Sequence, residues 1–256
     1  MIRDLRAKAA KFYDLNPHCP DDIRFYQERA SGKTVSVLEL GCGTGRVTLP
    51  LSRTCEFVQG IDNSEAMLSI CRSKLLQNKI SQSKVRVNHG DISNFALDRK
   101  FDLIIAPYRT FQNLETDEEI DGLFRCIRDH LAVNGRGILN VFKPRFADRA
   151  TLIREWPNPE EALDWLVVEG ETTITCHHKK TRLDPKKLIL YPDLIYRVRQ
   201  GQTLSDEVVL NLVMRCYFPE DFENLIRNKG FDIMARWGSY SGEPYGAGPD
   251  LIIEFR

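Results

Sequence analysis

The chain has 256 residues, a length that fits one large α/β domain with or without an inserted subdomain. Hydrophobic residues make up 42% of it and charged residues 28%, and its 36 basic and 36 acidic side chains cancel. This balance disfavours a nucleic-acid partner, because nucleic-acid binding usually rests on a basic surface. The sequence has no apolar run near the roughly 20 residues of a membrane span and no signal peptide at its start. We therefore expect no membrane association.

The cysteine pattern predicts a reducing compartment. The seven cysteines are odd in number and form no C-x-x-C pair, so a disulfide framework is not expected and a cytoplasmic location is. Cys176, His177 and His178 are adjacent, but neighbours on a strand point to opposite faces. We therefore predict no metal site.

The first 142 residues alternate between short apolar runs and helical segments. Residues 1–30 are predicted to be helical, with a break near residues 16 and 17. Strands are predicted at 35–40, 56–62, 85–88, 101–106 and 137–142, and helices at 46–53, 64–77 and 118–131. This alternation predicts a parallel sheet with helices on both faces, as in a Rossmann-like α/β/α sandwich.

The pattern changes after Lys143. Residues 148–165 are predicted to be helical, and 166–178, 187–199 and 207–216 to be extended, with turns at 183–185 and 200–202. We expect residues 148–216 to form an inserted antiparallel subdomain that covers the substrate. A helix at 219–229 and strands at 231–237 and 251–255 would then complete a main domain made of residues 1–147 and 217–256.

A glycine-rich turn follows the first predicted strand. Gly41, Gly43 and Gly45 are spaced by two, and a helix begins directly after them. Glycines allow a sharp turn and leave no Cβ between the backbone and a ligand, while the helix N-terminus offers free N–H groups. A dinucleotide site would have its third glycine at the position of Arg46, so the spacing argues against NAD.

Acidic residues follow the next two strands. Asp62 ends the second strand, where a carboxylate can accept both hydroxyls of a ribose. Asp91 follows the third strand, where a side-chain acceptor and a backbone N–H suit an adenine. Either residue alone could be a helix N-cap or a turn residue. Together with the glycines, in strand order, they favour a nucleoside-containing ligand.

The runs VLELGCGTGR at 37–46, GIDNSEAML at 60–68, GDI at 90–92 and FDLIIA at 101–106 closely resemble class I S-adenosylmethionine-dependent methyltransferases of the small-molecule type. The resemblance covers residues 33–142 and resumes from Arg215 onward. It implies S-adenosylmethionine as cofactor and a seven-stranded, mostly parallel sheet with an antiparallel last strand. One departure is the family's Leu-x-Pro-Gly-Gly turn, which has Asn134 and Gly135 here; both residue types can take positive φ, so we expect the turn to form.

The resemblance also assigns cofactor contacts. The glycines would pass under the methionine part, Asp62 would hold the ribose, and Asp91 and Ile92 would hold the adenine. Tyr13 and Tyr26 lie in segments that resemble a lid over the cofactor, although either ring could equally pack into the core. The predicted cofactor-binding residues are Tyr13, Tyr26, Glu39, Gly41, Cys42, Gly43, Gly45, Asp62, Asn63, Met67, Asp91, Ile92 and Ala106.

The acceptor in this family lies past the fourth strand, so residues 107–111 should line its pocket. Methyl transfer needs mainly alignment, with a general base only where the acceptor requires one. Tyr108 is the catalytic candidate because it could position or deprotonate the acceptor, or it could simply pack. Arg215 would share a strand face with residues 209, 211, 213 and 217, and could pair with an acidic substrate or with the sheet's own acids. The predicted substrate-binding residues are Tyr108, Phe111, Arg215 and Tyr217.

These features predict a methyltransferase that moves a methyl group to an N or O atom of a small molecule by in-line displacement, as a monomer or a homodimer. A basic hairpin at 179–187 leaves an RNA or protein acceptor open. A non-catalytic module that binds S-adenosylmethionine is a further alternative, and a nicotinamide oxidoreductase is a distant one.

Overall fold

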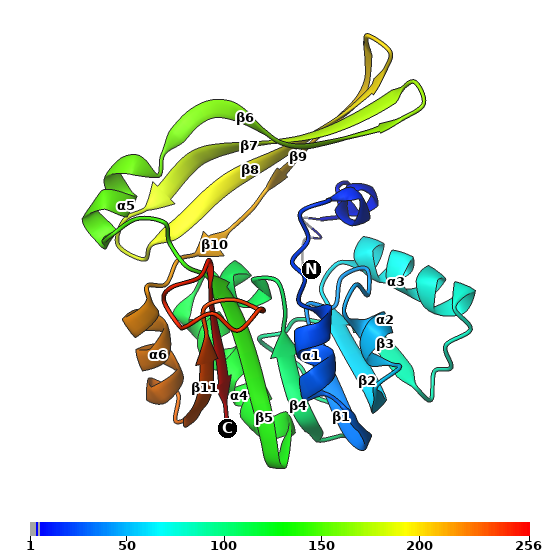
Figure 1. Cartoon of the computed structure of the whole chain (residues 1–256), viewed down its shortest axis with the longest axis vertical. Coiled ribbons are helices and arrows are strands. Elements are labelled where there is room, and N and C mark those ends of the chain that lie inside the picture. The colour runs from blue at the N-terminus through cyan, green and yellow to red at the C-terminus, as the bar shows by residue number, and fades with distance from the viewer. Residues whose placement is uncertain (1–3, 5) are drawn as a thin grey trace.

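The computed structural model describes residue 4 and residues 6–256, without the side chain of Lys33 (Figure 1). Its larger sheet has seven strands in the order β11-β12-β5-β4-β1-β2-β3. The strands are β1 (Gly32–Leu40), β2 (Cys55–Asp62), β3 (Val85–His89), β4 (Phe101–Ala106), β5 (Leu131–Phe142), β11 (Ile233–Trp237) and β12 (Asp250–Phe255). The helices are η1 (Ala10–Leu15), α1 (Ile23–Arg29), α2 (Thr48–Leu51), α3 (Glu65–Gln77), η2 (Thr110–Asn113), α4 (Asp117–His130), α5 (Arg149–Glu155) and α6 (Pro219–Asn228).

The strand directions confirm the predicted fold class. β1 runs parallel to both β2 and β4, and β3 and β5 extend this parallel set on either side. β12 is antiparallel to both of its neighbours, β5 and β11. The carboxyl ends of β1 to β4 therefore meet at one edge of the sheet, where ligands of doubly wound folds bind.

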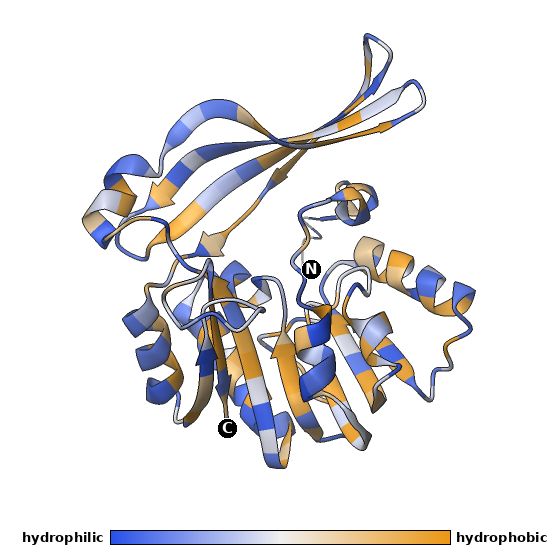
Figure 2. Cartoon of the chain, viewed as in Figure 1, coloured by the Kyte–Doolittle hydropathy of each residue, from blue (hydrophilic) through white to orange (hydrophobic). Residues whose placement is uncertain are grey.

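The central strands are buried on both faces. Leu38 and Leu40 of β1 belong to one apolar cluster, whereas Val37 belongs to another, so successive side chains enter cores on opposite sides of the sheet. Figure 2 shows these strands as mainly hydrophobic and the surrounding helices as mixed. Continuous apolar runs are what a parallel sheet between two helical layers requires.

Most predicted elements of the larger sheet agree with the structure within a few residues. β5 is the exception, since it begins at Leu131, which pairs with Phe101, rather than at 137. Asn134 takes φ +68°, so the predicted turn forms at an asparagine. In the N-terminal segment predicted as helical, the described residues form η1 and α1 only, and residues 1–3 and 5 lie outside the described part.

The second sheet is antiparallel and lies over the carboxyl edge of the first (Figure 1). It contains β6 (Asn158–Glu169), β7 (Thr172–Asp184), β8 (Ile189–Gln200), β9 (Thr203–Asn211) and β10 (Met214–Arg215). β9 and β10 both pair with β8. The predicted single strand at 207–216 is therefore interrupted, and Arg215 does not continue one stripe from Val209 and Asn211.

The helix predicted over residues 148–165 is wrong beyond residue 155. Only α5 is helical, and β6 begins at Asn158. Pro157 and Pro159 explain the difference, because proline lacks the N–H that a helix interior needs and its ring clashes with the preceding turn. After the prolines, Trp165 is buried while Leu166 is exposed, an alternation typical of a strand.

In the described residues, no helix is long and apolar enough to cross a membrane.

Candidate functional site

The glycine loop follows β1 in a conformation that other residues rarely adopt. Gly41, Gly43 and Gly45 have φ values of +71°, +54° and +83°. A Cβ on Gly41 would lie 2.4 Å from Cγ2 of Thr110, and a Cβ on Gly45 would lie 2.6 Å from Sγ of Cys71. Backbone conformation and close packing both require glycine here. The loop is thereby held against the turn that follows β4.

Asp62 fixes the shape of this loop. Its Oδ2 accepts the N–H of Gly43 and its Oδ1 accepts the N–H of Ser64, both at 2.8 Å. Burial raises the pKa of Asp62, while the two N–H donors act in the opposite direction. The N-cap of α3 is Ser64, whose hydroxyl accepts the N–H of Met67. Asp62 is therefore not the N-cap of this helix. Each carboxylate oxygen keeps a lone pair for a further donor.

Glu39 and Cys42 are buried beside the loop. Glu39 is 2% exposed, and its Oε2 accepts a 2.5 Å hydrogen bond from the hydroxyl of Thr48. Burial raises the pKa of Glu39 to about 8 and the pKa of the Cys42 thiol well above its usual range. Within the described part of the chain, no group donates to Oε1 of Glu39, which leaves an acceptor for a cationic ligand group.

The loops after β2 and β3 are joined. The carbonyl of Asp62 accepts the N–H of Gly90 at 3.0 Å. Asp91 forms a tight turn, in which its Oδ1 accepts the N–H and the hydroxyl of Ser93 at 2.8 and 2.7 Å. Ile92 packs against the core. The structure thus brings Asp62, Asp91 and the glycine loop to one edge, as the sequence predicts.

The other residues predicted to contact the cofactor lie at the same edge of the larger sheet. Met67 is buried, and its methyl group would lie 3.3 Å from a Cβ on Gly43. Asn63 is exposed, and its carbonyl lies 3.1 Å from Nε2 of His89. Ala106 is fully buried at the end of β4.

Residues 10–22, which we call the N-terminal strap, connect the glycine loop to the second sheet. Asp14 accepts a 2.7 Å hydrogen bond from the hydroxyl of Thr44. Asp22 forms two hydrogen bonds with the guanidinium of Arg46, at 2.5 and 2.8 Å. At its other end, the ring of Phe12 stacks on Tyr196 of β8 at 4.9 Å.

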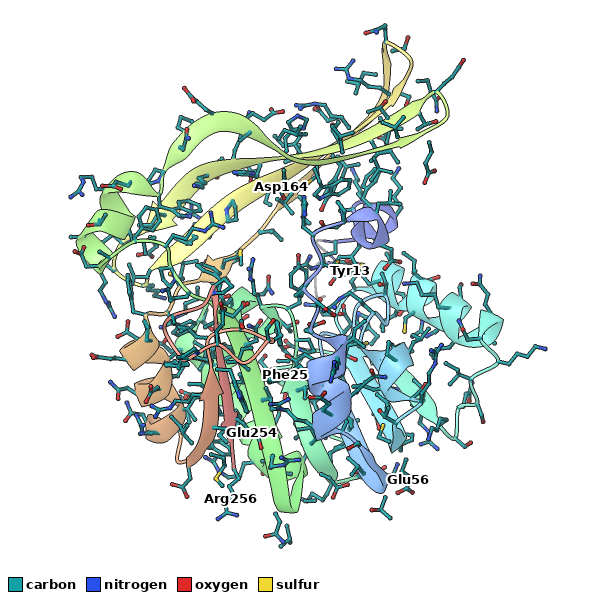
Figure 3. The ribbon with its side chains drawn as sticks, in the orientation of Figure 1. Tyr13, Phe25, Glu56, Asp164, Glu254 and Arg256 are labelled. Carbon is teal, nitrogen blue, oxygen red and sulfur yellow. The ribbon has the colours of Figure 1, made fainter. Side chains whose placement is uncertain are left out.

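The two predicted lid tyrosines differ in position. Tyr13 lies on the strap between the second sheet and the larger sheet (Figure 3). It is half-buried, and burial raises its pKa to about 12. Tyr26 is fully buried, with its ring against Phe25 and its hydroxyl 3.5 Å from that of Tyr240. The lid prediction for Tyr26 therefore needs correction, because its side chain has no surface left for a cofactor.

The turn after β4 is strained. Tyr108 and Arg109 have φ values of +49° and +67°, which cost side-chain-bearing residues of the order of 1–3 kcal/mol each. The buried Asn140 holds the turn, since its Oδ1 accepts the N–H of Arg109 at 2.9 Å. Burial raises the pKa of Tyr108, so its phenol stays protonated at neutral pH. It is therefore suited to hydrogen bonding rather than to removing a proton.

Three predicted acceptor residues have protein partners instead. Phe111 is fully buried and stacks on Tyr217, which is 6% exposed, at 5.5 Å. Both rings belong to the main core and offer almost no surface to an acceptor. Nη1 of Arg215 lies 2.6 Å from Oδ1 of Asp117 at the start of α4, so its charge is already paired. The two rings and the guanidinium thus have protein contacts, while the buried hydroxyl of Tyr217 has no hydrogen-bond partner among the described residues. Contact of these three residues with an acceptor stays a prediction.

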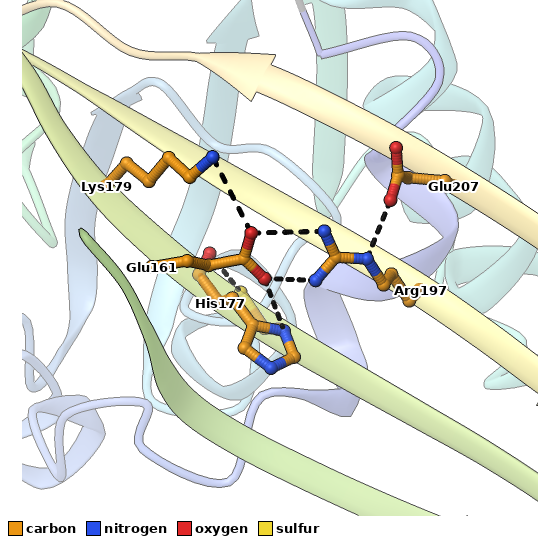
Figure 4. A network of polar contacts seen from close by, with 6 residues as sticks. Glu161, His177, Lys179, Arg197 and Glu207 are labelled. Atoms are coloured by element: carbon orange, nitrogen blue, oxygen red, sulfur yellow. Dashed lines mark hydrogen bonds and ion pairs between the residues drawn. The ribbon is translucent and has the colours of Figure 1, made fainter. Parts of the chain in front are cut away.

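The second sheet presents different residues on its two faces. Its inner face, formed by Trp165, Cys176 and Tyr196, packs on Phe12. Figure 4 shows the outer face, where Glu161 contacts Arg197, His177 and Lys179 and where Arg197 also binds Glu207. Cys176 and His177 thus point to opposite faces. One lysine of the predicted basic hairpin, Lys179, is engaged in this network.

Asp164 lies on the inner face of the second sheet, a position that the sequence did not reveal. Leu163 pairs with His177 and Trp165 with Cys176, so Asp164 is the extra residue of a β-bulge. A bulge redirects side chains locally. Burial raises the pKa of Cys176 and of Tyr108, and the carboxylate of Asp164 adds to both shifts, so Asp164 lies on the inner face, on the side of the turn after β4. A bulge depends on pairing with β7, so no local pattern predicts it.

Comparisons with known proteins agree with this geometry. Residues 37–135 match a family model described as a methyltransferase domain. A cypemycin N-terminal methyltransferase from a Streptomyces species is 26% identical over 230 residues, which are 83% of this chain and 78% of that protein. A dTDP-3-amino-3,6-dideoxy-alpha-D-glucopyranose N,N-dimethyltransferase from Streptomyces fradiae is 24% identical over 183 residues, which are 67% of this chain and 64% of that protein.

A solved structure shares the whole fold. It is an S-adenosylmethionine-dependent methyltransferase from Clostridium acetobutylicum, with a TM-score of 0.77, 19% identity and coverage of 97% of both chains. Residues 37–135 thus carry a methyltransferase domain, and the fold around it is that of a solved S-adenosylmethionine-dependent methyltransferase.

The glycine loop at 41–45, Glu39 and Asp62 form a cradle whose chemistry fits the cofactor S-adenosylmethionine. Glycines at 41, 43 and 45 let the loop backbone take positive φ and leave no Cβ between the backbone and the cofactor. Glu39 offers a buried carboxyl oxygen to an ammonium group, and Asp62 offers lone pairs to hydroxyls. A hollow of about 540 Å³ on β11, lined in part by Met234 and Arg236, lies at the far edge of the sheet from this cradle.

Proposed function

We propose that this methyltransferase methylates an amino nitrogen of a small molecule. Both relatives described above are named for methylation of nitrogen, one at a peptide N-terminus and one on an amino sugar. The sequence features allow nitrogen or oxygen as the methylated atom, and Asp164 of the second sheet adds a reason to favour nitrogen.

In this proposal, the glycine loop, Glu39, Asp62 and the Asp91 turn hold the cofactor, with Tyr13 on the strap above it. S-adenosylmethionine supplies a methyl group on a sulfonium sulfur, from which a nucleophile can displace it. The chain has to hold the acceptor in line, which is a matter of proximity and orientation. The fixed turn after β4 serves this purpose, because Asn140 and the close contact between Thr110 and Gly41 tie it to the cradle.

Tyr108 is proposed as the residue that positions the acceptor. Its raised pKa keeps the hydroxyl available as donor and acceptor of hydrogen bonds. It is the candidate catalytic residue only in this orienting sense, since a protonated phenol does not remove a proton.

Asp164 is the observation that carries the proposal of an amine. It is an exposed carboxylate on the inner face of the second sheet, opposite Tyr108. Among the residues that the structure describes, Asp164 has no ion-pair partner. A carboxylate on the second sheet suits a substrate that arrives as an ammonium ion, because charge complementarity favours its capture. The nitrogen must release one proton, to this carboxylate or to water, before its lone pair can displace the sulfonium sulfur.

A small acceptor is favoured by the cover over the site. Residues 148–216 would form the substrate-cover subdomain, and residues 1–147 and 217–256 the domain that binds the cofactor. The strap closes part of the space between them through Phe12 and Asp14. An RNA acceptor is not favoured, since the net charge is zero. A non-catalytic module would bind the cofactor but show no transfer to any amine.

The test uses methyl-labelled S-adenosylmethionine with amino sugars and short peptides, each paired with its hydroxyl counterpart. We expect transfer to the amines alone. In Asp164→Asn, the KM for an accepted amine should rise at least tenfold while the KM for the cofactor stays unchanged. Asp193→Asn is the control, because Asp193 binds Asn211 on the outer face. Equal transfer to the hydroxyl compounds, or an unchanged KM in Asp164→Asn, would contradict the proposal.

A further inference from the structure

Arg109, on the turn after β4, carries a positive charge that no described residue pairs with. Its guanidinium lies 5.8 Å from the centre of the Tyr108 ring and 5.6 Å from that of Phe142. Its Nε is buried, and within the described residues it has neither a hydrogen-bond acceptor nor an ion pair. The residues outside the described part are Met, Ile, Arg and Leu, none of which carries a carboxylate.

Arg46 provides the contrast. Its guanidinium also approaches the Tyr108 ring, at 5.5 Å, but Asp22 pairs with it through two hydrogen bonds. Burial raises the pKa of Asp250, and the nearby guanidinium of Arg109 acts in the opposite direction, yet Oδ1 of Asp250 accepts a hydrogen bond from Asn140 at 3.2 Å. Of the two arginines beside Tyr108, one has a fixed partner and the other does not.

The backbone supports a role for this side chain. Arg109 has φ +67°, and the hydrogen bond to Asn140 holds it there. Strain of this kind persists only where the surroundings enforce it, and it is concentrated at ligand-binding sites. The turn therefore directs a cation to the acceptor side of the glycine loop.

We infer that Arg109 binds an anionic group of the acceptor, either a carboxylate or a phosphate. The inference rests on the proposed function and narrows its substrate class to amines that also carry an acidic group. A planar guanidinium matches both anions with paired N–H donors. Asp164 on the second sheet and Arg109 on the turn after β4 would then hold the two ends of the same molecule.

The test measures anion binding without any amine or methyl transfer, so its failure is distinct from failure of the proposed function. Protein saturated with S-adenosylhomocysteine is titrated by calorimetry at low salt, once with inorganic pyrophosphate and once with malonate. We expect binding at one site, weakened at least tenfold in Arg109→Gln. Arg199→Gln, which removes the same charge from the exposed end of β8, should bind as the unaltered protein does.

A second neutral variant, Arg109→Asn, guards against misfolding, because asparagine tolerates positive φ better than glutamine does. Unchanged affinity for S-adenosylhomocysteine verifies that each variant keeps the cradle. Tighter binding of pyrophosphate would identify a phosphate as the group recognised, and tighter binding of malonate a carboxylate. Equal anion affinity in the Arg109 variants and the unaltered protein would overturn the inference, as would failure of the unaltered protein to bind either anion.

Discussion

Replacement of Asp62 by asparagine tests whether one side chain both shapes the glycine loop and binds the cofactor. The carboxylate accepts two backbone N–H groups, from Gly43 and Ser64, through different oxygens. Asparagine offers one oxygen, so one buried donor loses its acceptor at a cost of about 1–3 kcal/mol. For a chain of this size the melting temperature should fall by about 2–4 °C per kcal/mol. Since the ribose would lose an acceptor as well, the Kd for S-adenosylmethionine should rise at least tenfold.

Calorimetric titration and urea unfolding measure the two effects separately. Asp102→Asn is the matched control, because Asp102 lies at the opposite end of β4 and one oxygen accepts both the N–H and the hydroxyl of Ser36, at 2.8 Å. An asparagine can keep both bonds, so stability and cofactor affinity should stay near those of the unaltered protein. A folded Asp62→Asn variant with unchanged cofactor affinity would refute the ribose assignment, and unchanged stability would refute the role in shaping the loop.

Two further predictions concern Glu39 and Asp22. Because burial raises the pKa of Glu39 to about 8, its proton must leave before the carboxylate can receive the cofactor's ammonium group. Affinity should rise by about tenfold per pH unit below about pH 8 and stop rising near that pH, where the ammonium group itself begins to lose its proton. Glu39→Gln should show no such rise. Titration from about pH 6 to 9 measures this, and a flat profile for the unaltered protein would contradict it. Asp22→Asn should lower the free energy of unfolding by about 3–5 kcal/mol, because it leaves the guanidinium of Arg46 without its buried partner. Urea unfolding checks this against Glu28→Gln, which breaks an exposed pair with Arg24 and should leave stability nearly unchanged. Similar losses in both variants would refute the anchoring of the strap.

The sequence predicts the larger sheet well because its strands obey a local rule. A buried parallel strand is a mainly apolar run that ends at a turn, and the strands at 35–40, 56–62 and 101–106 follow this rule. β3, at the edge of the sheet, instead alternates apolar with polar residues. The second sheet is harder to predict, because its strands are partly exposed and mix polar with apolar residues. The sequence pattern therefore predicts a helix at 158–165, although Pro157 and Pro159 indicate against it.

The same distinction applies to the site. The cofactor edge depends on backbone geometry, which glycines and acids at strand ends reveal, and the structure brings Gly41, Asp62 and Asp91 together as predicted. Side-chain partners distant in sequence are not visible in this way. Arg215 pairs with Asp117, and only the fold brings these two residues into contact.

This difference also bears on how acceptor specificity is determined. The cradle is built from backbone N–H groups and from buried carboxyl groups that also bond to the protein itself. Substitutions in the cradle therefore affect both folding and cofactor binding. Arg109 and Asp164 lie instead on a turn and a bulge, and neither has an ion-pair partner within the described part of the chain. Their replacement breaks no described ion pair. Variants at these two positions should therefore alter acceptor recognition while cofactor affinity is preserved, and that separation is what the proposed experiments measure.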